Sequence, residues 1–207
     1  MKYYYSHKKA FLFLKAASLL LIILTFTSNL FSQPKPEDRP RLDIGNLFTA
    51  SGWMGDGEFG RKYIAFDGAY KAVPHSPPSC IKVKYTFGPK RWGGIYWQNK
   101  PDNWGDKPGN DYSRRGFRRI TFWVKGETGN EVVEFKAGDI RDLAKRYHDS
   151  FAVTIGKVTL SREWRQYTID LEKTDLSSVI GGFCWVASAD YNDQRDIAFY
   201  IDDIYFE

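Results

Sequence analysis

Residues 92–104 (WGGIYWQNKPDNW) combine aromatic rings with side-chain amides and a carboxyl group. Trp92, Tyr96, Trp97 and Trp104 lie where a strand-like run passes into a loop rich in Pro, Asn, Asp and Gly. A flat ring can stack on the apolar face of a pyranose, while amides and carboxylates hydrogen-bond its hydroxyls. The pattern therefore predicts an exposed surface that binds sugars.

Two rings of this stretch are the first candidates for stacking, Trp97 and Trp104, and Trp123 is the third. The expected hydrogen-bonding partners of the sugar are Gln98, Asn99, Asp102 and Asn103. Two alternatives stay open, because one of Tyr96 and Trp97 must face inward if the run is a strand. Trp104 could equally anchor its loop against the rim of the domain.

Trp123 interrupts an alternating run, since the apolar residues at 120, 122 and 124 share one face of a strand and Trp123 lies on the other. If that outward face lines a groove, Trp123, Glu134 and Lys136 border it. The alternative is a loop that folds over Trp123 and completes a second small cluster.

Period-two alternation recurs in residues 81–87, 120–125, 133–136, 166–171 and 199–206, and turn residues separate these runs. Nine or ten strands at this spacing predict an all-β fold, a two-sheet antiparallel β-sandwich. Segments 139–147 and 175–180 are the two places where a helical turn is expected. In residues 199–206 both faces are apolar, as in a covered strand.

The amino-terminal 32 residues read as a secretory signal peptide, with Lys2, Lys8 and Lys9 before an apolar stretch at 16–26. Cleavage is expected near Ser32, and the alternative is an uncleaved membrane anchor. Residues 33–41 read as a linker and 42–207 as one domain. The mature protein is thus expected to be exported, to the periplasm, the outer surface or the medium, with membrane contact only through an uncleaved segment.

The first 32 residues hold four of the 30 basic side chains and none of the 25 acidic ones, so the remainder is nearly neutral. This balance argues against a nucleic-acid partner, which needs concentrated basic charge. Arg114, Arg115, Arg118 and Arg119 form a local basic group that we interpret as a solvated loop edge.

No catalytic constellation is evident, and the sequence predicts that the protein is not an enzyme. His7 falls in the leader, and His75 and His148 fall in turn-like stretches away from any nucleophile motif. In an exported protein Cys80 and Cys184 could pair or remain separate buried thiols.

Nine motifs together resemble the exported jelly-roll domains of the galactose-binding-like superfamily in bacteria, which are similar to carbohydrate-binding modules. They are 51–56 (SGWMGD), 80–85 (CIKVKY), 94–98 (GIYWQ), 102–105 (DNWG), 120–126 (ITFWVKG), 133–136 (VEFK), 164–171 (WRQYTIDL), 181–186 (GGFCWV) and 200–204 (YIDDI). The resemblance covers residues 42–207. It implies a jelly-roll fold and a non-catalytic protein that binds polysaccharide or oligosaccharide.

The resemblance also implies a structural calcium ion near the chain ends. Asp202 or Asp203 would be the ligand from the last strand, with Asp43 and Asp67 as candidate partners by position. The alternative is that Asp202 and Asp203 form ion pairs or accept backbone hydrogen bonds. The competing function is a structural or interaction protein of the cell envelope, with a calcium-stabilised sandwich and a protein partner.

Overall fold

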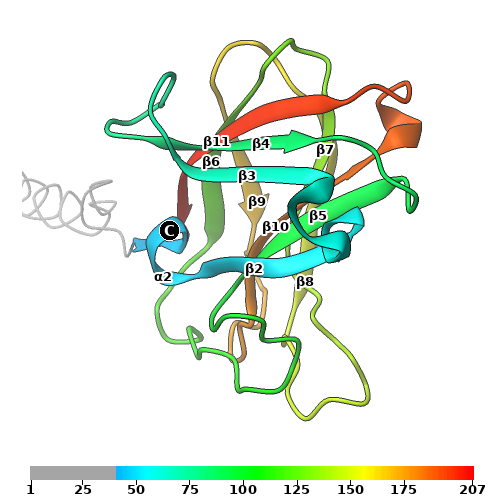
Figure 1. Ribbon diagram of the computed structural model, residues 1–207. Helices are drawn as coiled ribbons and strands as arrows, with labels where there is room; N and C mark the ends of the chain where they lie inside the picture. The colour runs from blue at the N-terminus through cyan, green and yellow to red at the C-terminus, as the bar shows by residue number, and fades with distance from the viewer. Residues whose placement is uncertain (1–40) are drawn as a thin grey trace, which may run out of the picture. The chain divides into compact units, whose positions relative to one another are not determined.

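The fold consists of two sheets, and strand β11 lies in the middle of the first, which we call sheet A (Figure 1). Most residues of β11 are buried. The computed structural model describes residues 41–207, which belong to one compact unit. The strand order of sheet A is β3-β4-β11-β6-β9, and β1 pairs with β11 as well. These strands are β1 (Leu42–Asp43), β3 (Ile64–Tyr70), β4 (Cys80–Tyr85), β6 (Arg119–Gly126), β9 (Arg165–Asp170) and β11 (Ile197–Phe206).

Sheet B contains the other five strands in the order β2-β5-β10-β7-β8. They are β2 (Thr49–Gly55), β5 (Trp92–Gln98), β7 (Val132–Gly138), β8 (Ala152–Thr159) and β10 (Gly181–Ser188). Every pairing in both sheets is antiparallel. The structure therefore confirms the predicted two-sheet antiparallel β-sandwich.

Alternation along the strands fills the space between the sheets, as expected for a sandwich. Phe122 of sheet A lies 4.8 Å from Phe135 and 4.9 Å from Phe183, both of sheet B, measured between ring centroids. The intervening positions, including Trp123 and Lys136, point away from this core. The molecule thus has two outer faces, one on each sheet, with the core between them.

Helical structure in the described residues is short: α2 (Ile44–Leu47), η2 (Asp56–Lys62) and η3 (Ala189–Tyr191). The helical turns expected at 139–147 and 175–180 are loops, because polar side chains there bond to nearby backbone. Asp142 and Asp175 each accept a hydrogen bond from an amide two residues further on, which favours a turn over a helix.

Cys80 lies in β4 of sheet A and Cys184 in β10 of sheet B, and both are buried free thiols. Burial raises the pKa of the Cys80 thiol to about 11. Within residues 41–207, no helix is both long and apolar enough to cross a membrane. The expected leader, and all but the last residue of the expected linker, lie outside the described residues.

Candidate functional site

Strand β5 sorts the aromatic side chains of residues 92–98 between two environments. Trp97 is 2 % exposed and packs in the core, with its ring centroid 6.0 Å from Phe66 and 5.5 Å from Phe183. Trp92 and Tyr96 lie on the opposite, outward side of sheet B, as the period of a strand requires. Trp97 as a stacking residue is therefore corrected: both faces of its indole are covered by core residues.

The outward side of sheet B carries a second apolar cluster, separate from the main core. Tyr96, Ile140, Ile180 and Cys184 are its buried members. Met54, Trp104, Tyr147 and Val186 are half-buried and pack on them. Together with Trp92, which is 39 % exposed at the start of β5, we call this surface the aromatic face.

Trp104 belongs to this face because its ring contacts Tyr96 of β5. Its ring lies edge-on to Tyr96, with centroids 6.0 Å apart and planes at 87°. The indole is thus half-buried, and part of its surface is available to solvent. Trp104 therefore combines its two expected roles. Part of its ring anchors the loop, and part of it is exposed.

Charged and hydroxyl side chains from β7 and β8 border the aromatic face. The Lys136 ammonium lies 5.6 Å from the centroid of the Tyr96 ring and 3.9 Å from an Asp139 carboxylate oxygen. The Thr154 hydroxyl donates a hydrogen bond of 3.1 Å to Glu134. The border can therefore both donate and accept hydrogen bonds, which a polyhydroxylated ligand needs.

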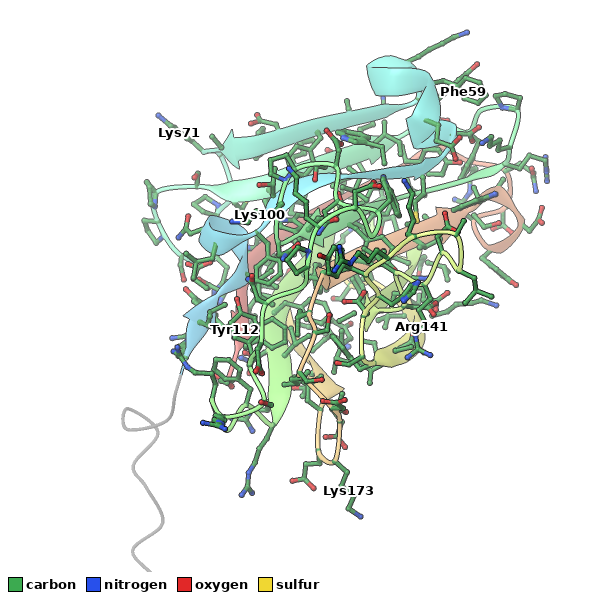
Figure 2. The ribbon with its side chains drawn as sticks, turned by 90° about the horizontal axis from the view of Figure 1, so that it is seen from below. Phe59, Lys71, Lys100, Tyr112, Arg141 and Lys173 are labelled. Carbon is green, nitrogen blue, oxygen red and sulfur yellow. The ribbon has the colours of Figure 1, made fainter. Side chains whose placement is uncertain are left out.

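Two loops meet at the end of sheet B where Trp104 lies. Figure 2, which looks at the molecule from below, shows the loops that carry Lys100 and Arg141 at this end. The Tyr147 amide donates to the Gly105 carbonyl at 3.1 Å, and Lys145 pairs with Asp106 at 2.6 Å. Residues 99–107 and 139–150 thus support each other beside the aromatic face.

Asp149 ties the second of these loops to β10. Its side chain is 4 % exposed and accepts hydrogen bonds from the amides of Ile140, Ile180 and Gly181. Burial raises the pKa of the Asp149 carboxyl to about 6, and the three amides act in the opposite direction.

The amides expected to contact a sugar are turned inward. Gln98, Asn99 and Asn103 are 0 %, 7 % and 1 % exposed. Their side chains bond to each other, to Ser51 and to loop backbone. Their assignment as ligand contacts is therefore corrected, because these three side chains are buried and bonded within the protein. Asp102 is exposed at the tip of the same loop and remains a candidate contact.

Trp123 faces away from sheet A, on the other side of the molecule from Glu134 and Lys136. The His75 ring stacks on it with centroids 3.8 Å apart and planes at 17°. The loop that follows β3 thus folds over Trp123, which was the alternative expectation. A single groove bordered by Trp123, Glu134 and Lys136 is ruled out, because β6 and β7 belong to different sheets.

Two further tryptophans differ in their environment. Trp164 is half-buried beside His75, 5.8 Å between ring centroids. Trp185 is in the core at 0 % exposure.

The four candidate calcium ligands do not form a metal-binding set. Asp202 accepts the amides of His75 and Ser76 at 2.9 and 3.0 Å, and Asp203 accepts the Ser76 hydroxyl at 2.6 Å. Asp43 caps α2 by accepting from Asn46. Among residues 41–207, no three His, Cys, Asp or Glu side chains are grouped so that they could hold a metal ion. A pocket of about 390 Å³ is lined by Asp43, Asp202 and Asp203, but their oxygens accept bonds from protein donors and do not fit calcium as they stand.

The fourth candidate ligand, Asp67, is exposed in β3 and accepts the amide of Ala69 at 2.9 Å.

Sequence reasoning included Trp92 in the aromatic stretch but did not choose it as a stacking residue, although residues 92, 94 and 96 share one side of a strand. It missed Met54 and Tyr147 as members of the aromatic face. Met54 could be assigned only once β2 was known to pair with β5, and Tyr147 only once its loop was known to reach Gly105.

No family model matches the sequence, and no curated protein matches it significantly. Among solved structures, a family 30 carbohydrate-binding module is similar with a TM-score of 0.55 and 16 % identity, over 81 % of this chain and 98 % of that one. A second family 30 module gives a TM-score of 0.51 and 18 % identity, over 80 % and 86 % of the two chains.

A family 11 module from Clostridium thermocellum, in complex with a β-1,3-1,4-mixed-linked tetrasaccharide, has a TM-score of 0.53 and 14 % identity, over 81 % of this chain and 94 % of that one. At these identities the likeness concerns the fold. The chain has the β-sandwich architecture of carbohydrate-binding modules, as the sequence resemblance indicated.

Proposed function

We propose that this protein is an exported, non-catalytic protein like a carbohydrate-binding module, and that it binds a polysaccharide or oligosaccharide on the aromatic face of sheet B. The observation that carries the proposal is the placement of Trp92 and Trp104 on either side of Tyr96, along one strand and the loop after it. A contiguous apolar patch on a protein surface often marks a binding site.

The chemistry of the face supports a sugar as ligand. Half-exposed rings provide apolar surfaces for stacking, and Asp102, Glu134 and Lys136 provide hydrogen-bonding groups at the border. The fold likeness to carbohydrate-binding modules is independent support. Export rests on the leader at residues 1–32, and N-terminal sequencing of the mature protein tests it.

The first test is alanine substitution of each of these two indoles, W92A and W104A, with binding measured against a panel of soluble polysaccharides by affinity electrophoresis and calorimetry. We expect each variant to bind the preferred glycan roughly tenfold to a hundredfold more weakly, because a stacking surface is lost. The melting temperature should change little in W92A and fall more in W104A, since the Trp104 ring also packs on the second apolar cluster.

The matched control is W164A, which removes a half-buried indole from the side of sheet A. It should bind the glycan like the wild type. The proposal is contradicted if W92A and W104A both bind normally, or if W164A weakens binding as much as they do.

A further inference from the structure

Asn103 uses every hydrogen bond that its side chain can form, and all of them go to its own loop. Nδ2 donates to Asn99 Oδ1 at 2.9 Å and to the Lys107 carbonyl at 3.0 Å. Oδ1 accepts from the amides of Gly105 at 3.2 Å and Lys107 at 2.9 Å. A primary amide has two donors and two acceptor sites, so a ligand could bond to Asn103 only by breaking this arrangement.

These bonds close the loop on both sides of Trp104. The carbonyl of Asn103 itself accepts from Gln98 Nε2 at 2.9 Å, which fixes the loop to the end of β5. Gly105, directly after Trp104, has φ of 106° and leaves no room for a side chain: a Cβ there would lie 2.5 Å from the Tyr147 carbonyl oxygen. The backbone on both sides of Trp104 is therefore fixed by the Asn103 side chain, by Gln98 and by the close contact with Tyr147.

We propose that Asn103 is a positioning residue, which holds Trp104 edge-on to Tyr96 so that the solvent-exposed part of the indole is presented to a sugar. The inference rests on the proposed function, because the sugar is the reason for presenting the ring. In this inference the amide network of Asn103 supports the indole and does not contact the ligand. Asp102, the exposed neighbour of Asn103, remains the candidate for direct contact. Pre-organising a stacking ring lowers the entropic cost of binding.

The test uses the protein labelled with 5-fluorotryptophan, with the Trp104 resonance assigned by its absence in W104F. N103D replaces two donors with an oxygen that faces the acceptors of Asn99 and Lys107. We expect the Trp104 resonance of the free protein to shift or broaden, and the affinity for the preferred glycan to fall about tenfold. N99A, which removes one acceptor and leaves Asn103 in place, should move the same resonance less.

A double-mutant cycle shows whether Asn103 acts through the indole. N103D should have no further effect on affinity in the W104A background and should keep its full effect in the W92A background. E131Q is the control for a buried side chain that fixes another turn, since Glu131 is 4 % exposed and accepts from Thr128. We expect it to lower stability without changing the Trp104 resonance or the affinity.

The inference is overturned if N103D leaves the Trp104 resonance unchanged, or if it weakens binding equally with and without Trp104. The fluorine measurement needs no glycan, so it is independent of the proposed function. If W92A and W104A bind normally, the proposed function fails whatever the fluorine spectrum shows.

Discussion

At the scale of single residues, Asp149 links stability to pH. Burial raises the pKa of its carboxyl to about 6 in the folded protein, from the ordinary value of 3.8. The folded state therefore holds the proton more tightly than the unfolded state between these values. The contribution of Asp149 to the free energy of unfolding falls as pH rises from about 4 to 6 and is constant above. The total is on the order of 3 kcal/mol.

Urea unfolding of the wild type and of D149N, measured from pH 4 to pH 8, checks this prediction. The difference in free energy between the two proteins should change across pH 4–6 and level off above it. A difference that stays constant over the whole range would mean that the folded Asp149 titrates like the unfolded one. Other carboxylates contribute equally to both proteins and cancel in the comparison.

At the scale of elements, the loop between β3 and β4 is fastened to sheet A by His75. Its ring stacks on Trp123, and its Nδ1 donates to Asp203 at 2.7 Å. We expect H75A to lower the free energy of unfolding by about 1–3 kcal/mol, because a stacked contact and a hydrogen bond to a carboxylate are both lost. Hydrogen exchange of the amides in 71–79 should accelerate.

The control for this change is H148A, since the His148 ring forms a hydrogen bond to the Asp142 carbonyl, away from this loop. It should leave the exchange of residues 71–79 as in the wild type. Unchanged protection of that loop in H75A would show that the backbone bonds to Asp202 suffice to hold it.

Element patterns also explain what could be predicted from the sequence. The alternation of residues 120–124 placed Phe122 inside and Trp123 outside correctly, because side-chain direction in a strand is a local property. It could not say that β6 and β7 lie in different sheets, since pairing is set by contacts distant in sequence. Asn103 was expected to contact a sugar, whereas its side chain is buried in its own loop, because only the folded loop shows which way an amide points.

At the scale of the whole molecule, the two outer faces have different characters. The side of sheet B presents half-exposed rings, whereas on the side of sheet A the loop after β3 covers Trp123 and occupies the carboxylates of β11. The proposed ligand therefore belongs to the outer face of sheet B, whereas the covered outer face of sheet A stabilises the fold. The covered carboxylates of β11 also determine whether calcium can bind.

Asp202 and Asp203 already accept bonds from His75 and Ser76, so an ion would have to displace these donors to bind. We therefore expect elemental analysis of the purified protein to find no stoichiometric calcium. The melting temperature should be the same with excess chelator and with millimolar calcium, because a ligand stabilises the folded state only if it binds there. If calcium raised the melting temperature of the wild type but not of D202N, the ion would have displaced the loop donors from the carboxylates of β11.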